Sequence, residues 1–247
     1  MKNKAWIYFL IIILILVGLN IILFNLSPRQ VNVTKTEVPS FISQEGKTIV
    51  NMKLPAVDAD GNGVSTILKV EATPGSGRTL TDIENLLFWA DTQQSIRMAR
   101  AVANNISQAN VDNFDLIYNI EANASIIGGP SAGAALTIAT ISAIEGKKPN
   151  ENVMITGTIN HDGTMGPVSA ILEKAKASKR AGANIFLVPL LQSRDFVYET
   201  SQHCEQFGSN EVCSSETIPR KINVTEESGI EVIEVENIKE AMKYFFD

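Results

Sequence analysis

The chain has 247 residues, of which 45% are hydrophobic, and its formal net charge is −6. The acidic balance and the lack of a basic stripe with interleaved aromatic residues exclude a typical nucleic-acid-binding protein. The two cysteines and two histidines are scattered in a way that makes a poor zinc site, and we expect no metal and no cofactor.

Residues 1–26 predict a cytoplasmic tip and a transmembrane signal-anchor that inserts into the lipid bilayer. Residues 5–24 are almost entirely apolar, which is about the 20 residues needed to cross a bilayer. Trp6 and Tyr8 lie near one end, where interfacial aromatic residues are typical. The alternative, a cleaved signal peptide, would have a shorter apolar core and then a site of small residues, and no such site follows. Two lysines before this segment favour an N-terminus inside the cell, so we expect the rest of the chain outside the cytoplasm.

Residues 27–45 are polar and predict a linker, and residues 46–247 predict one folded domain. This length, about 200 residues, is enough for one sizeable hydrophobic core. The first two predicted strands, Thr48–Val57 and Val64–Ala72, are joined by the sequence D-A-D-G-N-G. That turn imitates the start of a calcium-binding EF-hand loop, but Lys69 stands where the loop needs its bidentate glutamate. We therefore predict a hairpin turn and no calcium site.

The next predicted elements lead to a glycine-rich turn around Ser131. Helical periodicity predicts a helix over Thr81–Ile106, and a strand follows over Phe114–Ser125. The sequence then breaks at two glycines and a proline, and small and apolar residues at helical spacing run up to Gly146, a typical helix C-cap. Ser131 therefore stands at a helix N-terminus, where it is either an N-cap or a nucleophile.

The turn that holds Ser131 would also assist catalysis if the serine is a nucleophile. The backbone N–H groups at the start of a helix are free, and the helix dipole is positive there, so both favour a developing oxyanion. Besides the serine, the residues of this predicted oxyanion turn are Gly129, Pro130, Ala132 and Gly133.

The stretch Pro167–Pro189 contains a candidate base. On a helical wheel Lys174 falls in the middle of a face of small and apolar residues, whereas the other basic residues of the helix fall on the opposite half. A lysine in an apolar setting loses its charge more easily, and its neutral amine can act as a general base for Ser131. The alternative is that Lys174 extends its amine along this face to the solvent. Strands are predicted on both sides of this helix, at residues 153–159 and 184–188.

Residues 190–228 form a long polar excursion that interrupts the alternation of strands and helices. Both cysteines of the chain, Cys204 and Cys213, lie in it, which favours a disulfide over two inert thiols. A disulfide is stable in an oxidising compartment, in agreement with a domain outside the cytoplasm. A last strand is predicted at Ile230–Val235 and a closing helix at Ile238–Phe245.

Four motifs follow one another in the second half of the folded domain. They are G-G-P-S-A-G-A-A-L-T-I-A at 128–139, M-I-T-G-T-I at 154–159, D-G-T-M-G-P-V at 162–168 and I-L-E-K-A-K-A-S-K-R-A-G at 171–182. In order and spacing they resemble the proteolytic domain of the Lon protease family, and weaker similarity extends the resemblance to roughly residues 45–190.

This resemblance implies a fold, a site and an assembly. The implied fold is the α+β fold of the Lon proteolytic domain, which is like domain 2 of ribosomal protein S5. In the implied site Ser131 is the nucleophile, Lys174 is the base and Thr156 supports the lysine. Lon domains form rings in the family, so a homo-oligomer is also implied.

The chain departs from the family pattern at three positions and in one motif. Gly128 stands where many Lon enzymes have an acidic residue, and Asn123 and Ser125 stand where bacterial members have histidines. These changes leave the serine and the lysine in place but affect how the site closes and which side chain it accepts. The phosphate-binding motif of an ATPase, G-x-x-x-x-G-K-[ST], occurs nowhere in the 247 residues.

We therefore expect a membrane-anchored serine endopeptidase that works without ATP and cleaves unfolded proteins or peptides through Ser131 and Lys174. Two alternatives stay open. One is a Lon-like interaction module without activity, and the other is a proteolytic subunit that serves a separate ATPase. With the expected topology, a cytoplasmic ATPase would lie on the wrong side of the membrane.

Overall fold

The structure is a computed structural model that describes residues 39–44, 46–83, 87–122, 126–208 and 210–246. The predicted signal-anchor at residues 1–26 and most of the predicted linker lie outside these ranges. Within the described ranges no helix combines the length and the apolar character that a membrane span requires.

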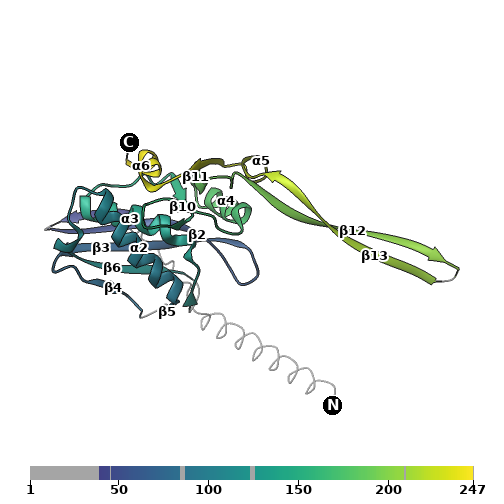
Figure 1. Cartoon of the computed structure of the whole chain (residues 1–247), viewed down its shortest axis with the longest axis horizontal. Coiled ribbons are helices and arrows are strands. Elements are labelled where there is room, and N and C mark those ends of the chain that lie inside the picture. Colours follow the sequence, from purple (N-terminus) through teal and green to yellow (C-terminus); the bar gives the residue numbers. More distant parts are fainter. Residues whose placement is uncertain (1–38, 45, 84–86, 123–125, 209, 247) are drawn as a thin grey trace, which may run out of the picture. The chain divides into compact units, whose positions relative to one another are not determined.

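A five-stranded sheet forms one half of the folded domain (Figure 1). In the order of pairing its strands are β1 (Phe41–Gln44), β2 (Lys47–Val57), β3 (Gly63–Pro74), β6 (Phe114–Glu121) and β4 (Thr79–Thr81). Neighbouring strands are antiparallel except β4 and β6, which are parallel. Alternate residues of β2 are buried, including Val50, Met52 and Leu54, because successive side chains of a strand point to opposite faces. The buried face packs against the helices that carry the site.

Helix α3 (Gly133–Glu145) is buried on every side. Every residue from Gly133 to Ile144 is buried, in agreement with a sequence that is apolar or small all round the helix. Helix α2 (Ala90–Ile106) packs beside it and buries only one face, which includes Ile96, Ala99 and Val102. Gly146 ends α3 in the left-handed conformation, with φ 65°, as its predicted role as a C-cap requires.

A three-stranded parallel sheet forms the other half of the domain. Its order is β14 (Glu231–Val235), β11 (Ile185–Pro189) and β8 (Val153–Ile155). Helix α4 (Ile171–Arg180) packs on it, and Ile171 and Leu172 form a second core with Met154 and Phe186. The short helix α5 (Val224–Ser228) and the closing helix α6 (Ile238–Phe246) follow β13 and β14.

The sequence predicted the first hairpin and the end of the chain correctly. Strands β2 and β3 match the two predicted strands, and in their turn the Asp58 carboxylate accepts hydrogen bonds from the backbone N–H groups of Asp60 and Asn62. This is the bonding of a tight turn, as predicted. The last strand and the closing helix also lie where they were predicted, within one residue at each end.

The helix predicted over Thr81–Ile106 is wrong in its first part, because α2 begins only at Ala90. Among the described residues before it, Thr81 ends β4, which pairs with β6, and β5 (Leu87–Phe88) pairs in parallel with β7 (Ile126–Ile127). Pairing with a distant segment therefore overrides the local helical pattern.

The strand predicted over residues 153–159 is divided in two. Strand β8 ends at Ile155, and β9 (Thr158–Ile159) pairs with a different strand, β10 (Met165–Gly166). Between them, Thr156 and Gly157 bond to the turn that holds Ser131, as described below. The division is therefore part of the site.

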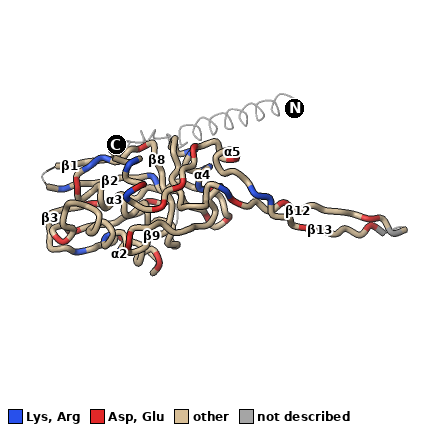
Figure 2. Tube along the Cα trace, turned by 45° about the horizontal axis from the view of Figure 1, so that its top comes forward, with Lys and Arg blue, Asp and Glu red and all other residues tan. Residues whose placement is uncertain are grey.

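A long two-stranded arm replaces the polar excursion for which the sequence analysis predicted no strands. Strands β12 (Arg194–Phe207) and β13 (Asn210–Asn223) pair antiparallel along their whole length, and the arm extends away from the rest of the domain (Figures 1 and 2). Cys204 and Cys213 lie directly opposite each other and form a disulfide, so their predicted pairing is confirmed.

Gly63 offers a test of how closely β3 and α4 pack. A Cβ atom at Gly63 would lie 2.0 Å from the backbone oxygen of Glu173 in α4. We predict that Gly63→Ala lowers the free energy of unfolding by about 3 kcal/mol, because backbone has to move to make room. Urea denaturation measures it.

Gly61→Ala is the matched control in the same hairpin. A Cβ there meets nothing within 4 Å, so only the strain of φ 84° remains, about 1 kcal/mol. Equal losses in the two variants would contradict the close approach of β3 and α4.

Candidate active site

Ser131 lies in a single 3-10 turn, η2 (Pro130–Ala132), directly before α3. Gly129 precedes the turn with φ 101°, a conformation that favours glycine. The N-cap positions of η2 and α3 are Gly129 and Ala132, and neither helix start has a side-chain cap. The interpretation of Ser131 as an N-cap is therefore wrong, and its half-buried hydroxyl is left for another role.

The turn has fewer free backbone donors than the sequence predicted. Pro130 has no N–H, and the N–H of Gly133 donates to the carbonyl of Pro130. The N–H of Gly129 donates to Oδ2 of Asp91 at 2.9 Å. Of the predicted oxyanion turn, only Ala132, together with Ser131 itself, keeps an N–H that no acceptor in the described part of the chain takes up.

Thr156 and Gly157 fix the backbone of Ser131. The carbonyl oxygen of Ser131 accepts a hydrogen bond from the N–H of Gly157 at 3.0 Å and one from Oγ1 of Thr156 at 3.3 Å. The carbonyl of Gly157 in turn accepts from the N–H of Ala134 in α3 at 3.0 Å. Thr156 is fully buried, and its own N–H donates to Leu187 of β11. The end of β8 is thereby bonded to the turn on one side and to the parallel sheet on the other.

Lys174 is buried, whereas the other basic residues of α4 face the solvent. Only 2% of Lys174 is exposed, so the interpretation in which its amine reaches the solvent is wrong. Lys176 pairs with Glu173 at the surface, as the helical wheel predicted. No carboxylate among the described residues pairs with Lys174, and burial alone lowers the pKa of its amine to about 8. The amine is therefore partly neutral near physiological pH.

Helix α4 packs on the sheet that contains β8, the strand that ends directly before Thr156. Ile171 and Leu172, three and two residues before the lysine, pack with Met154 of β8. Thr156 follows Met154 by two residues. The hydroxyl of Thr156 donates a hydrogen bond to the carbonyl of Ser131, and its predicted support of Lys174 stays a prediction.

Asp91 is the residue of the site that the sequence analysis missed. Its carboxylate accepts from the N–H of Gly129 and also, at 2.7 Å, from the N–H of Thr92. A Cβ atom at Gly128 would lie 3.3 Å from the ring of Trp89, so the start of α2 also packs against the turn. An acidic residue in the first turn of a helix is expected from the helix dipole, so nothing in the sequence indicated a bond to a loop 38 residues away.

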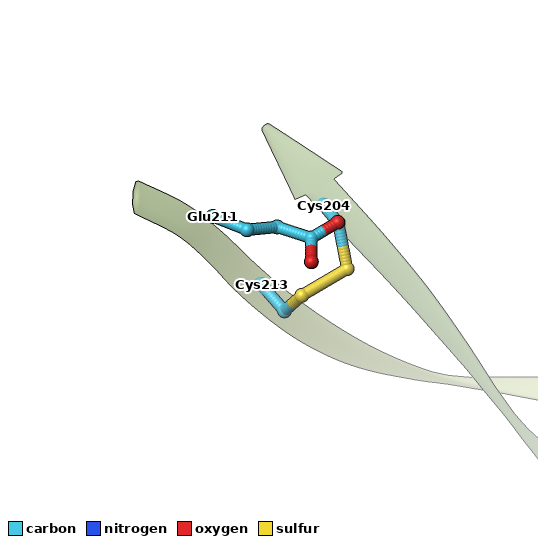
Figure 3. A group of neighbouring side chains, drawn as sticks. All are labelled: Cys204, Glu211 and Cys213. Atoms are coloured by element: carbon cyan, nitrogen blue, oxygen red, sulfur yellow. A yellow bond between two sulfur atoms is a disulfide. The ribbon is translucent and has the colours of Figure 1, made fainter. Parts of the chain in front are cut away.

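The described residues contain one group with the spacing of metal ligands, Cys204, Glu211 and Cys213 on the arm (Figure 3). The two sulfur atoms are bonded to each other, and metal binding needs the thiolate form of cysteine. This group therefore offers a metal one carboxylate and no thiolate.

The comparison with protein families decides the identity of the fold. The model of the Lon protease (S16) C-terminal proteolytic domain matches residues 65–206. The chain belongs to this family. The expected Lon-like α+β domain is thereby confirmed as a mixed fold of helices and sheets, and the family supports an enzyme of the serine peptidase class.

Lon proteases are also similar to this chain in direct comparison. The Lon protease of Methylocella silvestris is 30% identical over 182 residues, which are 69% of this chain and 22% of that protein. The Lon proteases of Phenylobacterium zucineum and Methanosarcina barkeri are each 33% identical, over 56% and 52% of this chain and 19% and 17% of their own lengths. The chain therefore spans about a fifth of the length of these relatives.

Asp91 should hold the turn of this Lon domain in place. We predict that Asp91→Ala speeds hydrogen exchange of the Gly129 amide severalfold, because the amide loses a charge-assisted hydrogen bond. Hydrogen-exchange mass spectrometry on the peptide that contains the turn measures it. Asp91→Asn keeps an acceptor oxygen and should restore part of the protection.

Asp60→Ala, in the turn between β2 and β3, is the control for loss of an acidic side chain. It should leave exchange in the Ser131 turn unchanged. Unchanged exchange in Asp91→Ala would show that the bond does not order the turn.

Proposed function

We propose that the chain is a serine endopeptidase in which Ser131 is the nucleophile and Lys174 the general base. The observation that carries the proposal is a lysine that is 2% exposed, has no described carboxylate partner and belongs to a Lon proteolytic domain. An unpaired buried ammonium destabilises a fold, so a buried lysine without a partner is a candidate functional group.

The proposed reaction passes one proton between the two side chains. The neutral amine of Lys174 takes the hydroxyl proton of Ser131 as the serine oxygen attacks a peptide carbonyl carbon. The resulting ammonium gives the proton to the leaving amine as the peptide bond breaks. Water then attacks the acyl-enzyme and loses a proton to Lys174. The ester bond to Ser131 breaks, the ammonium of Lys174 returns the proton to the serine oxygen, and the product leaves.

Backbone donors would stabilise the negative charge that forms on the carbonyl oxygen. The free N–H groups of Ser131 and Ala132 lie at the start of the buried helix α3, where the helix dipole also favours a negative charge. Loss of one such donor costs about 3–4 kcal/mol of transition-state stabilisation in other serine proteases. Thr156 would support the site from the other side, by positioning the backbone of Ser131.

The proposal includes anchoring to a membrane and activity without ATP, with unfolded proteins or peptides as substrates. The apolar segment at residues 5–24 supports the anchor, and the lack of a phosphate-binding motif in the sequence supports independence from ATP. The disulfide of Cys204 and Cys213 supports an oxidising, extracytoplasmic location.

The full-length chain in a mild detergent should hydrolyse an unfolded protein with no nucleotide added. We predict that Ser131→Ala and Lys174→Met each lower turnover at least a thousandfold, because each removes one half of the dyad. Lys176→Met, on the exposed face of α4, should leave turnover unchanged and is the matched control.

The outcomes separate the alternatives. No turnover without nucleotide, and no labelling of Ser131 by a serine-directed phosphonate, would favour the interaction module. Labelling without turnover would favour a subunit that needs an ATPase partner. Turnover that survives Lys174→Met would show that the lysine is not the base.

The pKa of Lys174 predicts how activity changes with pH. With a pKa of about 8, about a tenth of the amine is neutral at pH 7 and most of it at pH 9. We predict that kcat/KM rises about tenfold over this interval and then levels off, because the base must be neutral. A flat profile would contradict the role of the lysine.

The same shift predicts a change of stability with pH. Between pH 8 and 10.5 the unfolded chain holds the proton of Lys174 more tightly than the folded chain does, so the free energy of unfolding should rise with pH. The rise should be about 3 kcal/mol and should be absent from Lys174→Met.

A further inference from the structure

Within the described part of the chain, the arm formed by β12 and β13 packs against the domain at its base. There Ile222 is buried and Val197 packs against the second core. From Tyr198 to Gln206 and from Glu211 to Lys221 every described side chain is exposed. An isolated two-stranded hairpin is marginally stable in water, so an arm of this length presents surface that the domain itself does not cover.

The two faces of the arm differ in their environment. Directly opposite residues of an antiparallel pair lie on the same face, and residues two apart along a strand share it. The outer face consists of the even-numbered residues of β12 from Arg194 to Gln206 and the odd-numbered residues of β13 from Glu211 to Asn223. All of these are exposed, whereas the other face contains Ile222 and packs on the domain at its base.

The charges of the outer face lie only at its two ends. Arg194 and Lys221 lie at the base. Glu211 lies near the tip, next to the disulfide on the same face (Figure 3). Between these ends no residue of the outer face is charged, and Phe196 and Tyr198 are 54% and 72% exposed.

The other face carries charged residues along its length, and some of them lie close to a partner. Arg220 pairs with Glu199, and His203 lies 3.6 Å from Glu205. Lys221 and Glu211 on the outer face have no opposite charge within ion-pair distance among the described residues. The unpaired charges of the outer face are therefore positive at its base and negative near its tip.

We propose that the outer face binds the outer face of a second copy of this chain, with the two arms antiparallel. A two-fold axis through the middle of the arm would place the tip of one copy on the base of the other. Glu211 of one copy then comes within reach of Arg194 and Lys221 of the other, and the uncharged middle parts meet. The face is therefore complementary to itself, which favours a second copy over an unrelated partner.

The pairing register supports this symmetry. The outer face has seven rows, and the middle row is Thr200 and Thr217, whose hydroxyls lie 3.2 Å apart. The three middle rows, which are uncharged, would meet around the axis. The row of Glu211 would meet the row of Arg194, and the disulfide row would meet the row of Lys221. The arms have to wrap around each other, because two-stranded ribbons twist strongly.

The area of the outer face sets the expected affinity of the dimer. An arm of 14 residue pairs is about 46 Å long, so the two outer faces would bury on the order of 1,000 Å² in total. This lies at the lower limit of specific interfaces, and we expect a reversible dimer that dissociates on dilution.

The first experiment places a charge on the proposed axis. Sedimentation of the full-length chain in detergent at several concentrations measures the dissociation constant of the dimer. We predict that Thr200→Glu raises it at least tenfold, because two carboxylates would face each other across the axis. Ser201→Glu adds the same charge at the next residue, on the other face, and should leave the constant unchanged.

The second experiment exchanges the charges at the ends. Glu211→Lys and Lys221→Glu should each weaken the dimer, and the double variant should restore it, because the pairs reform with reversed sign. Mass spectrometry under non-reducing conditions confirms that each variant keeps its disulfide. A monomeric wild type, an equal effect of Thr200→Glu and Ser201→Glu, or a double variant as weak as the single ones would overturn the proposal. These readouts do not depend on peptidase activity.

Discussion

Helix α3 is apolar or small on every side, and a helix of this kind cannot face water anywhere along its length. The five-stranded sheet, α2 and the parallel sheet pack around it because only together do they cover all of its faces. Ser131 lies directly before this helix, so the packing that drives folding also sets its position. The hydrogen bonds from Gly157 and Thr156 to the carbonyl of Ser131 also fix the orientation of the serine backbone. A glycine at 133 is part of the same arrangement, because a Cβ there would lie 2.8 Å from Ile159.

The burial of Lys174 works against stability. Its pKa falls from 10.5 to about 8 because the charged form loses its hydration and gains no ionic partner. The second core, with Phe186 and Met154 fully buried, offsets that cost by removing apolar surface from water. A fold selected for stability alone would place an apolar side chain here. The loss of stability from burying Lys174 is explained if the proposed reaction uses the neutral amine.

The arm is stabilised by different interactions from those that stabilise the rest of the domain. No described side chain of its outer part is buried, so the backbone hydrogen bonds and the disulfide near its tip hold the two strands together. This explains why its sequence is polar and why no periodic hydrophobic pattern revealed its strands. It also explains why the distribution of charge, rather than of apolar residues, distinguishes its two faces.

The sequence by itself determined those features that depend on neighbouring residues. These are the first hairpin with its turn at Asp58, the end of α3 at Gly146, the amphipathic helix that carries Lys174 on its apolar face, and the pairing of the only two cysteines. Only the tertiary structure decided the contacts that join distant segments. The strand pairing of Leu87–Phe88 shortened a predicted helix, Asp91 occupied an N–H that the turn was expected to offer, and Thr156 bonded to Ser131. Periodicity and turn chemistry are local properties of the chain. The choice of a partner for a backbone N–H or a strand edge depends instead on which segments folding brings together, and no local pattern contains that information.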